Sequence, residues 1–234
     1  MKNFIKVMLG NKVNFKKAKM PSQKFLDGKY VALESIDINK HSKDLYVNFS
    51  KDKEHRIWTY LPYGPFKSYG SFKKWLKSFC LNKDPFFYAI YAKRHGQYCG
   101  MASYLRITPN HGTIEVGHIN YSPILQNTVE GTEAMYLMMK NTFEVSGNRR
   151  YEWKCNNLNF ASKKAAKRLG FKFEGVFRQM FVIKDRNRDS AWFSIIDKEW
   201  KKLKKFGEKI FFSNFCPNMG ETFLTIEIAI YVRF

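Results

Sequence analysis

The residues with the clearest chemical potential lie at positions 122–134, where a strand pattern gives way to a helical one. Gly131 stands directly before a helix that the spacing of apolar residues predicts over residues 132–143. The first backbone N–H groups of a helix have no partner inside it, and the helix dipole favours negative charge there. This turn is therefore a candidate site for a phosphate group. An ordinary connection between a strand and a helix is the alternative that the local sequence leaves open.

A second candidate is the hydroxyl group of Ser162, in a helix that we expect to begin at Asn159. Three apolar residues share its helical face, at spacings of three, four and seven positions: Ala165, Ala166 and Leu169. The hydroxyl group is therefore expected to point inward, where it needs a hydrogen-bond partner. A small polar residue near the start of a helix, without a chemical role, is the alternative.

Hydrophobic patterning predicts the elements that must position these residues. Alternation typical of strands covers residues 30–36, 86–92, 97–107, 113–121, 150–156, 172–183 and 191–196. Helical spacing covers residues 37–49, 72–79, 132–143 and 159–169, and Ser71 is expected to cap the second of these. Three consecutive strands indicate an antiparallel meander, and the alternation of strands and helices after it indicates a crossover unit. The predicted fold class is α/β, with one mixed sheet in a single domain over about residues 25–200.

Composition excludes several classes of protein. Hydrophobic residues make up 44% of the 234 residues and aromatic residues 17%, which is too many for a wholly disordered chain. No apolar run reaches the roughly 18 residues of a membrane-spanning helix. The four cysteines and five histidines show no ligand spacing, so we expect neither a metal site nor a disulfide framework. Reduced thiols and the lack of a secretory signal favour a cytoplasmic protein.

The charge is strongly positive, with 41 Lys and Arg against 20 Asp and Glu, a formal net charge of +21. We expect residues 1–24 to form a flexible basic leader, and residues 201–234 a basic and apolar C-terminal extension in which residues 223–232 alternate as an edge strand would. Such a field attracts nucleic acids, phosphorylated cofactors and acidic proteins alike. The motifs of common nucleic-acid-binding domains are missing. A basic protein that binds nucleic acid or the ribosome through its leader remains an alternative.

The candidate phosphate turn also resembles a known motif. Gln126-x-x-Val129-x-Gly131 is similar to the Q/R-x-x-G-x-G/A pyrophosphate loop of the GCN5-related N-acetyltransferases (GNAT). The resemblance covers about residues 28–200 and is strongest to the branch that includes ribosomal-protein N-terminal acetyltransferases of the RimJ/RimL type. Further segments that carry it are residues 114–118, 149–156, 159–171, 174–178, 188–194 and 200. Val129 replaces the first glycine of the motif, and its side chain would crowd the pyrophosphate if the backbone there needed a positive φ.

The resemblance implies a GNAT fold whose fourth and fifth strands, here residues 113–121 and 150–156, splay apart to admit acetyl-CoA. Gly117 is a suitable place for the strand irregularity that such a splay requires. The implied cofactor site consists of the backbone of Ile119 and Tyr121, Asn159, and the loop residues Gln126, Asn127, Thr128, Val129, Glu130, Gly131 and Thr132. Four basic residues of the following helix are further candidates for the cofactor phosphates: Lys163, Lys164, Lys167 and Arg168.

The implied reaction is acetyl transfer from acetyl-CoA to a primary amine, either a protein N-terminus or a small molecule. Such amines are mostly protonated at neutral pH, so the reaction needs a base. Glu115, acting through water, is the expected base, and His118, on the opposite face of the strand, is its competitor. Ser162 is expected to donate to the sulfur of the leaving group.

The acceptor site is expected across the sheet from the cofactor. Its candidate residues are Trp58, Tyr60 and Tyr63, with Arg188 and Asp189 as further candidates. The protein is expected to be a monomer or a homodimer without membrane contact, and the basic leader could reach a ribosome or another polyanion. A non-catalytic sensor of acyl-CoA is the remaining alternative.

Overall fold

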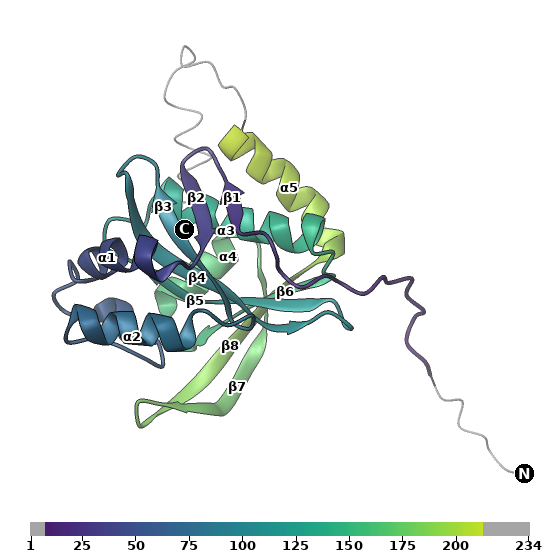
Figure 1. The fold of residues 1–234 in the computed structure, drawn as a ribbon. Coiled ribbons are helices and arrows are strands. Elements are labelled where there is room, and N and C mark those ends of the chain that lie inside the picture. Colours follow the sequence, from purple (N-terminus) through teal and green to yellow (C-terminus); the bar gives the residue numbers. More distant parts are fainter. Residues whose placement is uncertain (1–7, 213–234) are drawn as a thin grey trace, which may run out of the picture.

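The computed structural model describes residues 8–212, and a mixed sheet of eight strands runs through its centre (Figure 1). The strands lie in the order β1-β2-β3-β4-β5-β6-β8-β7. Every neighbouring pair is antiparallel except β5 and β6, which are parallel. The strands are β1 (Phe25–Asp27), β2 (Val31–Ser35), β3 (Phe86–Ala92), β4 (Gln97–Thr108), β5 (Thr113–Tyr121), β6 (Arg150–Asn156), β7 (Lys172–Ile183) and β8 (Arg186–Ile196). The predicted mixed α/β sheet is therefore confirmed.

Helices cover both faces of this sheet. They are α1 (Ile38–Phe49), η1 (Arg56–Trp58), α2 (Tyr69–Phe79), α3 (Val129–Lys140), the π-helical turn η2 (Asn141–Val145), α4 (Phe160–Arg168) and α5 (Asp197–Phe212). One core cluster joins α3, α4 and α5 to the sheet, and a second joins α1, η1 and α2 to the other face. Strand β3 shows the alternation that this requires, since Tyr88 and Ile90 belong to the first cluster and Phe87 and Ala89 to the second. Within residues 8–212 no helix has the length and apolar character needed to cross a membrane.

The helix starts follow local capping chemistry. Asp37 caps α1 by accepting hydrogen bonds from the amides of Asn39 and Lys40. Helix α2 is capped by Ser68, and the expectation that Ser71 is the cap is wrong. Ser71 is instead the third helical residue and completes a capping box with Ser68.

The two predicted terminal segments both contact the body of the protein. In the leader, Ala18 is buried, and the amides of Ala18 and Lys19 donate to the carbonyls of Pro109 and Ser146, at 3.1 Å and 2.8 Å. Helix α5 continues past position 200 and packs its Phe211 ring against a ring of α3. The predicted strand at residues 223–232 lies outside the described residues.

Strands β5 and β6 part halfway along their length. They pair only from Thr113 with Arg150 to Val116 with Trp153. Beyond this point β5 pairs only with β4, and β6 only with β8. The cause is a bulge at His118, whose φ of 51° coincides with a register shift between β4 and β5. The predicted splay is thus confirmed, but the irregularity lies at His118, one residue after the expected Gly117.

Candidate active site

The turn between β5 and α3 presents a row of free amide groups. Thr128 is the N-cap of α3, and Asn127 before it has a φ of 57°, which turns the chain into the helix. Within the described part of the chain, four consecutive amides donate to no acceptor: Asn127, Thr128, Val129 and Glu130. These N–H groups lie at the positive end of the helix dipole, where an anion is stabilised. We call residues 126–132 the phosphate turn.

The phosphate turn is held in shape by its own side chains. The Thr128 hydroxyl accepts from the Gly131 amide at 3.1 Å and donates to the Leu125 carbonyl at 2.7 Å. The Tyr121 hydroxyl donates to the Gly131 carbonyl at 2.8 Å, and the Gln126 side chain donates to the Tyr121 carbonyl at 3.0 Å. A Cβ atom on Gly131 would lie 2.8 Å from both the Leu125 oxygen and the Tyr121 ring. Only glycine therefore fits at this position.

Val129 does not strain the phosphate turn. It is the first residue of α3 and has a helical backbone, while the positive φ falls on Asn127 two residues earlier. The motif's first glycine is therefore not required here by backbone conformation.

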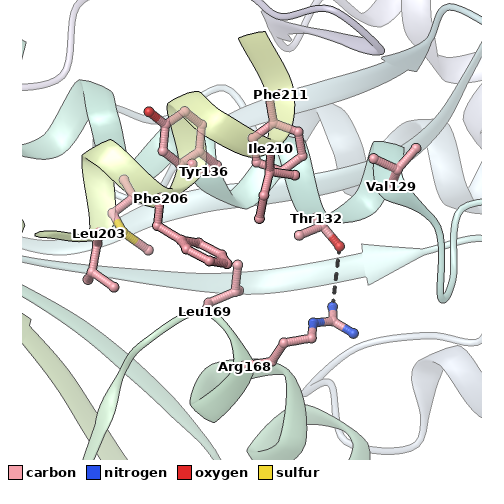
Figure 2. Close-up of a pocket in the computed structure, with 11 residues that line it drawn as sticks. Val129, Thr132, Tyr136, Arg168, Leu169, Leu203, Phe206, Ile210 and Phe211 are labelled. Atoms are coloured by element: carbon pink, nitrogen blue, oxygen red, sulfur yellow. Dashed lines mark hydrogen bonds between the residues drawn. The ribbon is translucent and has the colours of Figure 1, made fainter. Parts of the chain in front are cut away.

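Arg168 of α4 reaches across to the phosphate turn (Figure 2). Its Nη2 lies 3.4 Å from the Thr132 hydroxyl oxygen at the start of α3, and apolar side chains of α5 lie beside the pair. Its Nε is buried and has no partner among the described residues, and burial lowers the pKa of the guanidinium. Lys163, another basic residue of α4, donates instead to Asn157 at 3.2 Å. Arg168 is therefore a cation placed beside the free amides with unused donor capacity.

The parting of β5 and β6 opens a cavity of about 400 Å³, which we call the transfer cavity. It brings together seven of the site residues that the sequence singled out: Glu115, His118, Ile119, Asn159, Ser162, Tyr60 and Arg188. Glu115 and His118 were expected on opposite faces of β5, and this expectation is wrong. The bulge at His118 interrupts the alternation of the strand. Both residues line the same cavity.

Glu115 is buried, with 3% of its surface exposed, and it is paired with two cations. Nη1 of Arg106 donates to both carboxylate oxygens at 2.9 Å and 2.8 Å, and Nζ of Lys154 lies 2.8 Å from Oε2. Arg106 and Lys154 were not identified from the sequence, and Arg106 itself has a positive φ of 48° that interrupts the strand pattern.

His118 stands in an aromatic environment. Its Nδ1 lies 3.0 Å from the Tyr63 hydroxyl, and the two rings are stacked with centroids 5.6 Å apart. Burial, then the charges of Arg106 and Arg188, lower the pKa of His118 to about 4. The imidazole is therefore neutral at pH 7. Tyr63 lies behind His118 and does not line the transfer cavity.

Ser162 points inward, as its helical face predicts. Its hydroxyl oxygen accepts a hydrogen bond from the indole nitrogen of Trp153 at 2.9 Å. Because the indole can only donate, the hydroxyl proton of Ser162 is directed to another acceptor, and the Cys155 side chain lies within hydrogen-bond reach of it. The Asn159 side chain caps α4 by accepting from the Ser162 amide at 3.1 Å. Asn159 thus positions the start of the helix that carries Ser162.

The wall opposite Ser162 comes from the segment around η1. Tyr60 lines the transfer cavity, and its hydroxyl donates to the Leu158 carbonyl at 3.1 Å. Trp58 is a core residue with 4% exposure that packs edge-to-face on Phe49 and does not line this cavity. Its carbonyl accepts from Nζ of Lys184, at the tip of the β7–β8 hairpin, at 2.8 Å. The segment therefore forms hydrogen bonds to the β6–α4 loop on one side and to the β7–β8 hairpin on the other.

Residues 8–212 contain no group of three or more His, Cys, Asp or Glu side chains arranged to hold a metal ion. The three cysteines in this range, Cys80, Cys99 and Cys155, are buried and free.

Comparison with known proteins agrees with this geometry. A family model described as an acetyltransferase (GNAT) domain matches residues 33–172, more than half of the chain. The structure of a GCN5-related N-acetyltransferase from Brucella melitensis has a TM-score of 0.82 and 39% sequence identity, over 84% of this chain and 89% of that chain. A GNAT-family protein from Chromobacterium violaceum has a TM-score of 0.76 and 38% identity, over 86% and 100% of the two chains.

A more distant structure, from Vibrio cholerae and named for ribosomal-protein-serine acetyltransferase activity, has a TM-score of 0.64 and 16% identity, over 74% of this chain and 97% of that chain. At this identity it shares the fold alone. Curated proteins give no significant match. The family model and the two structures near 40% identity establish that the chain belongs to the GNAT superfamily of acetyltransferases, enzymes that use acetyl-CoA as the acyl donor.

Proposed function

We propose that the protein is an N-acetyltransferase that transfers the acetyl group of acetyl-CoA to a primary amine. The observation that carries this proposal is the parting of β5 and β6 beside a helix start with four free amides. A sheet rarely leaves two inner strands unpaired over half their length, because unpaired backbone groups need another partner. An extended cofactor with amide groups and a diphosphate would satisfy both features.

The residues present fit acetyl-CoA. The amides of residues 127–130 would hold the pyrophosphate, with Arg168 and Thr132 beside it. The open edge of β5, from Ile119 to Tyr121, would pair with the pantetheine arm. Gln126 and Gly131 shape the turn, and the side-chain amide of Asn159 would face the arm from α4.

The side chains of the transfer cavity would supply the proton transfers of the reaction. Acetyl-CoA supplies the acetyl thioester, whose carbonyl carbon the amine attacks while the thiolate of CoA leaves. Ser162 would donate its hydroxyl proton, which the bond from the Trp153 indole does not use, toward the leaving sulfur. Glu115 would accept the amine's proton through water, and neutral His118 is the competing base.

The resemblance to GNAT enzymes says less about the chemical class of the acceptor than about the cofactor. The RimJ/RimL-type branch would imply a protein N-terminus as acceptor, and the net charge of +21 would suit a site close to a ribosome. Buried free thiols in the described part of the chain suit the reducing cytoplasm that we propose as its location. Tyr60 is the aromatic residue of the η1 segment that would contact the acceptor, with Trp58 and Tyr63 supporting the wall behind it.

Two measurements test the proposal. Acetyl-CoA should raise the melting temperature, whereas heparin at equal charge should not, and the absence of stabilisation by acetyl-CoA would reject it. Release of free thiol should then be followed with a panel of amines and N-terminal peptides. Binding of acetyl-CoA without turnover of any amine would instead identify a sensor of acyl-CoA.

A matched pair of variants tests the cofactor site. Arg168→Gln should weaken acetyl-CoA binding by about tenfold, the loss expected for a charge-assisted hydrogen bond to a phosphate. Arg94→Gln, which removes an exposed arginine of the β3–β4 turn, should leave the affinity unchanged. Equal affinities for the two variants would remove Arg168 from the site.

A further inference from the structure

The transfer cavity carries more positive charge than its carboxylate can balance. Four cations line it, Arg56, Arg106, Lys154 and Arg188, against the single carboxylate of Glu115. Arg106 and Lys154 share that carboxylate. Arg56 forms an exposed ion pair with Glu54. Arg188 is the cation that remains.

Arg188 has no carboxylate within ion-pair distance among the described residues. Its Nε donates to the Ser190 hydroxyl at 3.2 Å, and its guanidinium lies over the Phe181 ring, 5.4 Å from the centroid. The side chain is partly buried, and this burial lowers the pKa of the guanidinium. The carboxylate of Glu115 acts on Arg188 only from beyond ion-pair distance. Partial burial of a cation is costly without a close anion, so an anionic ligand would stabilise Arg188 in this position.

A second cavity of about 470 Å³ adjoins the first and shares four residues with it: Tyr60, Asn156, Ile183 and Arg188. The charged side chains along it are Lys184, Arg186 and Arg188, with His55 nearby, and none of its lining residues is acidic. Arg188 therefore stands where the two cavities meet. Ser162 lines only the first cavity, so the second cavity extends the positive field away from Ser162.

This positive site is separate from the phosphate turn. None of residues 126–132 lines either cavity. The pyrophosphate of the cofactor would therefore be bound elsewhere, and Arg188 is left for the other substrate.

We propose that the acceptor is a small-molecule amine that carries an oxyanion, a carboxylate or a phosphate, which binds to Arg188. This rests on the proposed acetyltransferase function and names its substrate class. A guanidinium binds either oxyanion through two parallel hydrogen bonds, which would fix the distance from the anion to the amine. The surrounding cations would also lower the pKa of the bound amine and so reduce the demand on a base. Cavities of about 400 Å³ suit small ligands.

Matched pairs of acceptors test this inference. Initial rates of thiol release should be measured with glucosamine 6-phosphate against glucosamine, with tyrosine against tyramine, and with a neutral hexapeptide amide. We expect the anionic member of a pair to have a kcat/KM about 10- to 100-fold higher, as charge-assisted hydrogen bonds predict. Higher activity with the neutral amines or with the peptide would overturn the proposal. The phosphate and carboxylate pairs show which oxyanion is preferred.

Variants connect this preference to Arg188. Arg188→Gln should remove the preference and raise the KM for the anionic acceptor, while the KM for acetyl-CoA stays constant. Arg178→Gln, an exposed arginine of the same hairpin, should change neither value. Arg188→Lys keeps the charge but not the paired hydrogen bonds, so we expect a weaker preference for the anionic acceptor. If Arg188→Gln does not fold, Arg188→Lys takes its place in the test. An unchanged preference in the Arg188 variants would refute the assignment.

A binding arm separates this inference from the proposed function. Inorganic phosphate should be titrated into the protein saturated with CoA, so that the cofactor site is filled. Weaker phosphate binding in Arg188→Gln than in Arg178→Gln supports the anion site even if no amine of the panel is acetylated. Equal phosphate binding in the two variants contradicts it even if acetyl transfer is found.

Discussion

Burial gives the acidic and basic residues of the transfer cavity different chemical capacities. Glu115 is buried and forms ion pairs with Arg106 and Lys154. His118 is neutral and rests on aromatic rings, so it can accept a proton only by placing a cation in an apolar site. The two candidate proton acceptors therefore differ in their surroundings, with ion pairs around Glu115 and aromatic rings around His118.

The pH dependence of the rate distinguishes the two. Replacement of Glu115 by Gln should lower kcat about 100-fold and remove the acidic limb of the pH–rate profile, if this carboxylate accepts the proton. Glu152→Gln is a matched control, because Glu152 also pairs with Lys154, at 2.8 Å, but does not line the cavity. An acidic limb that survives in Glu115→Gln and disappears in His118→Asn would transfer the role to His118.

His118 should also make folding stability depend on pH. Its pKa is about 4 in the folded protein and about 6.5 when unfolded, so only the unfolded chain binds a proton between these values. Stability should therefore fall as the pH drops from 6.5 toward 4, by at most about 3 kcal/mol from this residue. Urea unfolding at pH 7 and pH 4.5 measures it. The loss should be smaller in His118→Asn, and equal losses in the two proteins would contradict the assignment.

Ser162 offers a test at the leaving group. Ser162→Ala should lower kcat by about 10- to 100-fold, since a positioned acid contributes an effect of about this size or larger. The KM for acetyl-CoA should change little, because the phosphate turn is untouched. Ser78→Ala, in which an exposed serine of α2 loses a hydrogen bond to the Trp75 carbonyl, is the control. An unaltered kcat in Ser162→Ala would exclude the proposed role.

At the scale of elements, the periodicity of apolar residues predicts the position of strands and helices and which face of each is buried. The alternation of Tyr151, Trp153 and Cys155 places β6, and the apolar face of α4 correctly turns Ser162 inward. The parting of β5 from β6 was expected from family resemblance and not from any local pattern. The periodicity of one strand does not predict where it stops pairing with its neighbour, because pairing depends on both strands. The family resemblance does predict this.

Bulges and contacts between residues far apart in the sequence cannot be predicted from the periodicity of apolar residues. The positive φ values of Arg106 and His118 break the alternation of β4 and β5 without a glycine to signal it. Arg106 therefore reaches the transfer cavity unpredicted, as the partner of Glu115, and His118, which was expected on the opposite face of the strand, lines the same cavity as Glu115. The anion-free position of Arg188 also emerges only when the hairpin is folded against the sheet.

Gly131 tests the phosphate turn as an element. An added Cβ would lie 2.8 Å from the Leu125 carbonyl, so Gly131→Ala must displace the turn and its free amides. We expect acetyl-CoA affinity to fall about tenfold or more, measured by isothermal titration calorimetry, because a diphosphate depends on the direction of these N–H groups. Gly70→Ala in α2, where the nearest side-chain atom is 3.9 Å away, is the control. Unchanged affinity in Gly131→Ala would place the diphosphate elsewhere.

On the scale of the whole molecule, the sheet separates two layers of helices, to which the proposed function assigns different substrates. The phosphate turn belongs to the layer of α3, α4 and α5, and the η1 segment that walls the transfer cavity belongs to the layer of α1 and α2. A closed sheet would keep these layers apart. The parting of β5 and β6 is the place where a donor from one side can meet an acceptor from the other, and the β7–β8 hairpin, which projects from the sheet in Figure 1, brings Arg188 to it.

Helix α5 completes the layer formed with α3 and α4, and its close packing on α3 can be tested by substitution. Gly207 lies against Tyr136 of α3, and a Cβ there would come within 2.1 Å of the tyrosine ring. An alanine inside a helix usually stabilises a protein relative to glycine by about 0.5–1 kcal/mol, and Gly70→Ala should show this gain. Gly207→Ala should instead lose about 1–3 kcal/mol, because α5 must move away from α3.

Urea unfolding of the two alanine variants compares these signs directly. Tyr136 and Thr132 lie one turn apart on α3, and both line the pocket that Arg168 enters beside α5 (Figure 2). A displaced α5 should therefore also weaken acetyl-CoA binding, whereas Gly70→Ala should leave it unchanged. If Gly207→Ala gained stability as Gly70→Ala does, α5 would not pack against α3 in solution, and the cofactor side of the protein would consist of α3 and α4 alone.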